Sequence, residues 1–222
     1  AMLFQDRTIA GQVLAEKLAA YANRSKVLIL GLPRGGVPVA FEVAKALQAP
    51  LDVFLVRKLG VPEQEELAMG AIASGGVRVL NYDIVEALHL SEAVIDRVTA
   101  RQQQELERRE RLYRRNRPLL QLRDRTIILV DDGLATGATM RAAIKAIQLQ
   151  QPTAIVVAVP VASPETHQEL ATQVDEIVCV EMPVPFYSVG SWYKEFPQTT
   201  DTQVCELLQQ ADAVAGALSP QP

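Results

Sequence analysis

Short apolar runs alternate with amphipathic stretches along the first half of the chain. Thr8 to Tyr21 carries apolar residues at helical spacing and therefore predicts an amphipathic helix. The compact apolar run from Lys26 to Leu30 predicts a buried strand, and Val37 to Leu47 predicts the helix that follows it. Leu51 to Val56 predicts another strand. Strands that alternate with helices are typical of an α/β protein.

The same alternation returns after Arg125. Thr126 to Val130 predicts a strand, and Met140 to Gln150 predicts a helix that turns Met140, Ala143, Ile144 and Ile147 inward. Ala154 to Val161 and Glu176 to Val180 predict two more strands. We therefore expect one α/β domain over residues 2–222, with a mostly parallel twisted sheet and helices on both faces.

Three segments interrupt this alternation. Residues 62–80 predict a flap and a hairpin around Ser74-Gly75-Gly76, although Glu65 and Glu66 are also typical of a helix start. Residues 91–116 predict a long charged helix, either a solvated face or a subunit contact, capped by Ser91 with Val94, Val98, Leu106 and Leu112 on one face. Residues 183–197 are aromatic and proline-rich and predict an irregular hood, and Ser219 to Pro222 are expected to fray.

The composition is typical of a globular protein and does not indicate a function. Of 222 residues, 49% are hydrophobic, which is enough for a buried core, and the net charge of -4 predicts no general attraction to nucleic acid or membranes. Two cysteines and two histidines lack metal-site spacing, and neither a signal-peptide pattern nor an apolar run of membrane-spanning length is visible. We expect a cytoplasmic protein with reduced thiols.

The most informative motif is TIILVDDGLATGAT, from Thr126 to Thr139. An apolar strand ends in Asp131 and Asp132, and a helix follows a loop of small residues. Small residues expose backbone amides, and amides at a helix N-terminus favour a phosphate. Two carboxylates would repel that phosphate, unless they accept hydrogen bonds from the vicinal hydroxyls of a sugar. The motif therefore indicates a sugar phosphate, although a capped turn without a ligand has the same outline.

Two well-known phosphate motifs do not match this stretch. A Walker A loop requires Gly-Lys-Ser/Thr, whereas Ala138 follows Gly137. A dinucleotide fingerprint requires G-x-G-x-x-G, which Gly133 and Gly137 do not supply.

A second loop has related chemistry. Pro33, Arg34, Gly35 and Gly36 also stand between a predicted strand and a predicted helix. Exposed amides and one fixed cation suit an anion, although a tight turn with a surface arginine has the same sequence. Lys58, with Arg57 before it, could add positive charge after the next strand or could serve solubility alone.

Together these residues resemble the type I phosphoribosyltransferases, and the chain as a whole resembles an uncharacterised bacterial group of that family. The resemblance implies that Asp131 and Asp132 bind the ribose hydroxyls of 5-phosphoribosyl-1-pyrophosphate (PRPP). The loop that holds the 5′-phosphate would comprise Gly133, Ala135, Thr136, Gly137, Ala138 and Thr139. Pro33 to Gly36 and Lys58 would bind pyrophosphate, with a strained or cis peptide near Pro33-Arg34. The first acid is often glutamate in that family, and here it is Asp131.

The resemblance also implies the reaction. The phosphoribosyl group would pass to a nitrogen nucleophile, such as a nucleobase, with inversion at C1 and release of pyrophosphate. Asp131, Asp132, Arg34 and Lys58 are the expected catalytic residues. Mg²⁺ would be held mainly through PRPP, with no direct protein ligand.

The acceptor is not identified by the sequence. Phe186, Trp192 and Tyr193 could stack on a planar base, but aromatic residues near a terminus also serve packing. A regulatory protein that senses PRPP or nucleotides is the alternative on the same fold. A nucleic-acid partner is not expected, because acids interrupt the arginine-rich helix. We expect a homo-oligomer, with a dimer as its simplest form.

Overall fold

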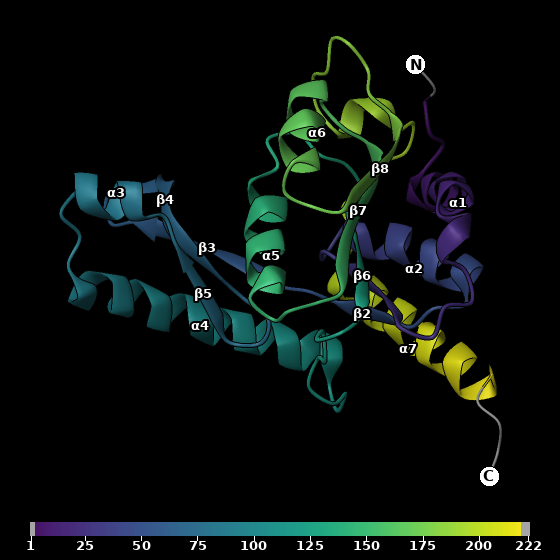
Figure 1. Cartoon of the computed structure of the whole chain (residues 1–222), viewed down its shortest axis with the longest axis horizontal. Coiled ribbons are helices and arrows are strands. Elements are labelled where there is room, and N and C mark those ends of the chain that lie inside the picture. The colour runs from purple at the N-terminus through teal and green to yellow at the C-terminus, as the bar shows by residue number, and fades with distance from the viewer. Residues whose placement is uncertain (1–2, 219–222) are drawn as a thin grey trace.

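The computed structural model describes residues 3–218 and contains a parallel sheet at its centre (Figure 1). Its five strands run in the order β2 (Leu51–Val53), β1 (Val27–Gly31), β6 (Thr126–Val130), β7 (Ala154–Val161) and β8 (Glu176–Glu181). Every neighbouring pair in this sheet is parallel. The predicted sheet is therefore confirmed, whereas the expected fraying of Ser219 to Pro222 lies outside the described residues.

Helices cover both faces of this sheet (Figure 1). One face carries α1 (Arg7–Lys17), α2 (Gly36–Leu47) and α7 (Asp201–Leu218), and the other carries α5 (Ala138–Gln148) and α6 (Pro164–Ala171). Within β6, Ile128 and Val130 join the first core, and Ile127 and Leu129 join the second. A strand covered on both faces has no polar face, which explains its unbroken apolar run.

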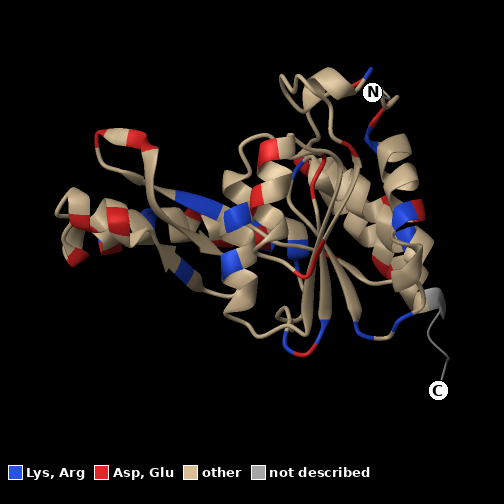
Figure 2. Ribbon diagram, turned by 45° about the horizontal axis from the view of Figure 1, so that its top comes forward, with Lys and Arg blue, Asp and Glu red and all other residues tan. Residues whose placement is uncertain are grey.

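A second, antiparallel sheet forms an arm that extends from the core (Figure 1). It contains β3 (Val56–Val61), β4 (Gln64–Ala73) and β5 (Val77–Leu80), accompanied by α3 (Tyr82–Ala87) and α4 (Glu92–Arg114). The predicted hairpin joins β4 to β5, and Gly75 and Gly76 adopt φ of 88° and 75°. Figure 2 shows acidic residues at the free end of this arm and basic residues on its strands closer to the core.

Two predictions for this region were wrong. The expected single strand from Leu51 to Val56 is divided, because the chain leaves the parallel sheet after Val53 and enters the arm at Val56. The residues between them, Phe54 and Leu55, remain buried, so hydrophobicity does not reveal the change of sheet. Glu65 and Glu66 lie in β4 and begin no helix.

The long helix α4 begins where the sequence predicts. The Ser91 hydroxyl accepts a hydrogen bond from the Val94 amide at 3.2 Å. Its predicted face is partly wrong, because Ile95 and Leu106 are buried while Leu112 is 36% exposed. In the last turn of α4 a charged residue is buried in place of an apolar one. Arg114 forms an ion pair with Asp52 at 3.0 Å.

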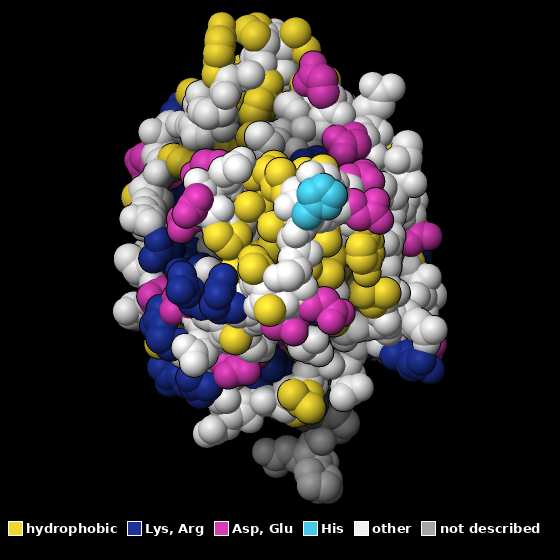
Figure 3. Space-filling view, turned by 90° about the vertical axis from the view of Figure 1, so that its left-hand side faces the viewer, with side chains coloured by type: hydrophobic (Ala, Val, Ile, Leu, Met, Phe, Trp, Pro, Cys, Tyr) yellow, Lys and Arg dark blue, Asp and Glu magenta, His cyan; other side chains and the backbone are white. Residues whose placement is uncertain are grey.

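The end of the arm presents apolar side chains within a charged surround. Figure 3 shows a hydrophobic area there, with acidic side chains around it and basic ones to one side. Tyr82 and Leu88, which are 67% and 38% exposed, belong to this part of the chain. Among residues 3–218, no helix combines the length and the apolar character that crossing a membrane requires.

Candidate functional site

The two predicted anion loops meet at one edge of the parallel sheet. Gly31 of β1 pairs with Val130 of β6, so the loops that follow them leave the sheet side by side. The amide of Leu32 donates to the carbonyl of Val130 at 3.0 Å. Ligands of open α/β sheets bind at this carboxyl edge. Residues that are about one hundred positions apart in sequence thus form one site.

The glycines of the first loop allow this close approach. A Cβ on Gly36 would lie 2.8 Å from the Val130 carbonyl oxygen, and one on Gly35 would lie 2.2 Å from Asp132 Oδ2. Neither position has room for a side chain, so both glycines are required by the neighbouring loop. The peptide bond between Pro33 and Arg34 is cis, as expected.

The second loop leaves its amides available for an anion. Gly137 has φ of 76° and is the N-cap of α5, whose first-turn amides have no intrahelical partner. The carbonyl of Thr136 accepts from Arg141 Nη1 at 2.8 Å, and the carbonyl of Ala135 accepts from Ser163 Oγ at 3.2 Å. Since these carbonyls are turned to other partners and the Thr136 and Thr139 side chains are exposed, the loop has the form of an anion cradle.

The two acids lie directly beside the glycine loop. Asp131 accepts a hydrogen bond from the Asp132 amide at 2.8 Å, and both side chains are partly buried. Burial, together with the adjacent Asp132 carboxylate, raises the pKa of Asp131 well above its ordinary range. Burial also raises the pKa of Asp132, and the nearby guanidinium of Arg7 opposes that rise. Two partly buried like charges are costly, so they indicate a site kept for a ligand.

Arg7, in the first turn of α1, belongs to the site although no sequence motif marks it. Its Nε donates to Asp132 Oδ2 at 3.0 Å, and its guanidinium carbon lies 3.9 Å from the centre of the Phe196 ring. A cation in the first turn of a helix opposes the helix dipole. The unfavourable position of Arg7 at a helix N-terminus was the one indication in the sequence that it pairs with a distant acid.

The aromatic segment has a different role from the predicted one. Tyr193 is 5% exposed, packs between Phe4 and Phe196, and donates its hydroxyl to the Asp132 carbonyl at 2.6 Å. Base stacking by Tyr193 is therefore wrong, and the packing alternative holds for it. Phe186 and Trp192 pack against the same cluster while partly exposed, so stacking by these two stays a prediction.

The predicted cations Arg34 and Lys58 are paired with other acids and are less firmly held than Arg7. Arg34 Nη1 lies 3.9 Å from Asp201 Oδ1, and Asp201 also accepts from the Tyr113 hydroxyl. Lys58 lies within β3 rather than after a strand of the main sheet, and its Nζ is 3.8 Å from Glu66 Oε2. Half of the Lys58 side chain is exposed, so its charge remains available to a ligand.

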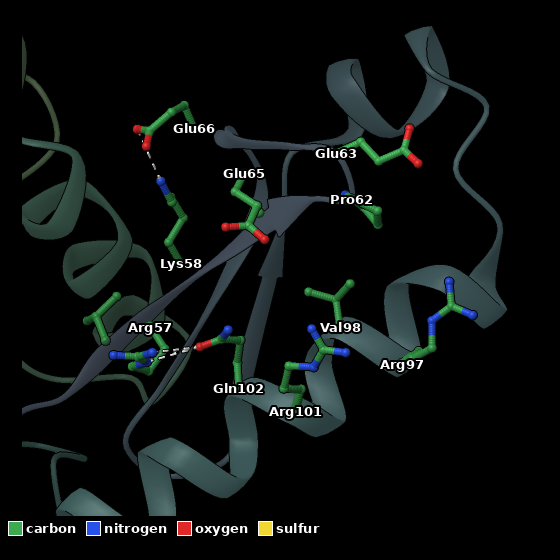
Figure 4. A pocket seen from close by; sticks show the side chains of 12 residues that line it. Arg57, Lys58, Pro62, Glu63, Glu65, Glu66, Arg97, Val98, Arg101 and Gln102 are labelled. Carbon is green, nitrogen blue, oxygen red and sulfur yellow. Dashed lines mark hydrogen bonds and ion pairs between the residues drawn. The ribbon is translucent and has the colours of Figure 1, made fainter.

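Two arginines of the arm border a cleft that reaches both loops. A cleft of about 40 Å³ is lined by Pro33 and Thr139, one from each loop, and by Arg57 and Arg109 of the arm. Arg57 also borders a cavity of about 640 Å³ between the β3–β4 turn and α4 (Figure 4). In this view Arg57 donates to Gln102 and Lys58 pairs with Glu66, so both cations of β3 border this cavity.

The geometry agrees with a comparison of the sequence with known families. A family model described as a phosphoribosyl transferase domain matches residues 4–191. The chain belongs to the phosphoribosyl transferase family. Within this phosphoribosyl transferase domain, the matched range contains both loops, both acids and the whole arm.

Relatives of this transferase domain support the same assignment. Two Mycobacterium tuberculosis proteins provisionally named phosphoribosyl transferases, MT0597 of strain CDC 1551 and Rv0571c of strain H37Rv, are each 49% identical over 219 residues. The match covers 97% of this chain and 49% of theirs, so the chain spans about half the length of these curated relatives. The crystal structure of TT1426 from Thermus thermophilus has a TM-score of 0.84 at 43% identity, covering 94% of this chain and 99% of that one.

The donor set at the strand end suits a hard cation. Asp131 and Asp132 offer carboxylate oxygens, which Mg²⁺ accepts directly or through water. These two residues therefore fit an Mg²⁺ ion. Within residues 3–218, no three His, Cys, Asp or Glu side chains are grouped so as to hold a metal ion.

Proposed function

We propose that this domain binds Mg²⁺-PRPP and transfers its phosphoribosyl group to a nitrogen nucleophile. The observation that carries the proposal is the convergence of the two loops, with Gly35 against Asp132 Oδ2. A diacid beside one anion loop suits a phosphorylated sugar, and a second anion loop beside the diacid suits a second phosphate group. PRPP has this order of groups: a phosphate, a diol and a pyrophosphate.

Each part of the site has a role in this proposal. Asp131 and Asp132 accept hydrogen bonds from the ribose hydroxyls. The 5′-phosphate receives donors from Gly133, Ala135, Thr136, Gly137, Ala138 and Thr139. Pyrophosphate lies on Pro33, Arg34, Gly35 and Gly36, within reach of Lys58. When bound, Mg²⁺ neutralises charge on the pyrophosphate oxygens.

The reaction requires little covalent chemistry from the protein. The C1–O bond breaks and pyrophosphate leaves with its electron pair, while the nucleophile supplies the pair for the new C1–N bond from the opposite face. Positive charge develops on the ribose, and Arg34 and Lys58 stabilise the leaving group. The arm hairpin is the proposed flap, which would exclude water from C1.

A sensor of PRPP or nucleotides remains the alternative function, since binding alone uses the same loops. An RNA-regulating form is not favoured, because Glu105 pairs with Arg108 and Arg109 on α4 at 2.8 Å and 3.0 Å. The acceptor base, a cytoplasmic location and a homodimer are further proposals. The hydrophobic area at the end of the arm is available for such a dimer.

The deciding experiment is pyrophosphate release from Mg²⁺-PRPP with a panel of nucleobases. Release that depends on one base supports the transferase. Binding of PRPP without release supports the sensor, and release without any base supports a hydrolase. If neither PRPP nor ribose 5-phosphate binds to the folded protein, the proposal is wrong.

A further inference from the structure

The N-terminal segment and the aromatic segment before α7 meet beside Asp132. Phe4 forms a parallel bridge with Tyr193, its amide donates to the Trp192 carbonyl at 2.9 Å, and its carbonyl accepts from the Lys194 amide at 2.8 Å. The start of α1 is therefore attached to the aromatic segment. Arg7 follows three residues after Phe4, so its backbone is fixed relative to the diacid.

Arg7 differs from an ordinary surface arginine. Its side chain is 10% exposed, and Asp132, its ion-pair partner, is 15% exposed. Besides Asp132, the guanidinium donates to the Pro197 carbonyl and covers the Phe196 ring. Such a group has lost most of its solvation, and its attraction to Asp132 is correspondingly stronger than that of an exposed pair.

Arg7 is directed at one oxygen of the motif. Asp132 Oδ2 lies 3.0 Å from Arg7 Nε, and the position of a Cβ on Gly35 is 2.2 Å from that oxygen and 3.2 Å from Arg7 Nε. Oδ2 is thus enclosed between the arginine and the glycine loop. Tyr193 holds the carbonyl of the same residue at 2.6 Å. With one carboxylate oxygen and the backbone fixed, the direction of the other carboxylate oxygen is also fixed.

Resting on the proposed function, we propose that Arg7 is a positioning residue of the ribose site and acts through Asp132. It keeps the carboxylate in one orientation beside Asp131. An unheld Asp132 would rotate, and the rotation would remove an acceptor from the sugar diol. Because Arg7 is enclosed by Asp132, Pro197 and Phe196, it supports the acid without contacting the sugar.

The test is a double-mutant cycle between Arg7→Ala and Asp132→Asn, read by calorimetric binding of ribose 5-phosphate and, separately, of inorganic pyrophosphate. We expect Arg7→Ala to weaken ribose 5-phosphate roughly 10- to 100-fold, the effect of losing a hydrogen bond to a charged group. Pyrophosphate binding should stay unchanged. The double variant should bind like Asp132→Asn alone, because the arginine acts only through that acid.

Two further variants separate positioning from folding. Arg7→Lys retains the charge and should restore part of the affinity even if Arg7→Ala folds poorly. Arg24→Ala removes another arginine placed over a ring, at 5.2 Å from Tyr21, and should leave binding unchanged. Wild-type affinity in both Arg7 variants, or additive losses in the cycle, would overturn the inference alone. A folded wild-type protein that ignores ribose 5-phosphate would overturn the proposed function and this inference with it.

Discussion

The edge of the parallel sheet and the arm both contribute charge to the site, but they hold it differently. At the edge, Asp132 is 15% exposed and has a partner at 3.0 Å, and Gly35 contacts it without space for a methyl group. On the arm, Lys58 is 50% exposed and its nearest acid is 3.8 Å away. The proposed sugar side is therefore preorganised, whereas the arm supplies the proposed pyrophosphate side with a cation that can move to a ligand.

The strongest test of the rigid edge removes both acids. Asp131→Asn with Asp132→Asn should lower kcat/KM for PRPP by about 100-fold or more, since two charged acceptors of the diol are lost. Steady-state kinetics with saturating acceptor would measure this. Circular dichroism should show an intact fold, because asparagine has nearly the same volume. Unchanged kinetics would exclude the diacid from the ribose site.

A second test adds a methyl group between the loops. Gly35→Ala should lower the affinity for PRPP about 10- to 100-fold and cost about 1–3 kcal/mol of stability, because its Cβ would strike Asp132 Oδ2 at 2.2 Å. The matched control is Gly216→Ala, since nothing lies within 4 Å of a Cβ there. Equal behaviour of the two variants in binding and thermal unfolding would contradict the close approach of the loops.

A substitution on the arm should have a smaller effect on the kinetics with PRPP. Lys58→Ala should raise the KM for PRPP by about three- to tenfold, because an exposed, mobile cation contributes modestly. The effect should weaken at high salt, since exposed charges are screened. Lys26→Ala, which lies just before β1 at the opposite end of the sheet, is the control and should leave KM unchanged. A Lys58 effect as large as that of the diacid would remove the distinction between the two regions.

The smallest expected effect concerns stability and its pH dependence. The pKa of Asp131 is raised in the folded state, so its protonated form favours folding. This contribution is present below the unfolded pKa of Asp131 and is lost as pH rises through the folded pKa. Asp131→Asn should therefore stabilise the protein at neutral pH by roughly 0.5–2 kcal/mol while it impairs PRPP binding. Chemical denaturation at pH 4 and pH 7.5 would reveal a flatter profile than that of the wild type. If Asp131→Asn were less stable than the wild type at neutral pH, this prediction would be wrong.

Much of the site was predictable because its chemistry is local. Asp131, Asp132 and the loop to Thr139 follow a strand in sequence, and their small residues and acids indicate a sugar phosphate directly. The other loop, Pro33 to Gly36, was predictable for the same reason. Parallel neighbours β1 and β6 then place both loops at one edge. Lys58 was located less well, because the apolar run through Phe54 and Leu55 hides the passage to a second sheet.

The sequence by itself determined most strands of the main sheet, most of the helices and the positions of the two small-residue loops. Each of these depends on periodicity or on residues adjacent in the chain. Only the tertiary structure decided that Arg7 pairs with Asp132, 125 positions later, and that Tyr193 supports the acid instead of facing a base. Such contacts depend on where the N-terminal segment and the aromatic segment before α7 pack against the sheet. Periodicity shows that a side chain is buried, but it does not show which distant residue will become its partner.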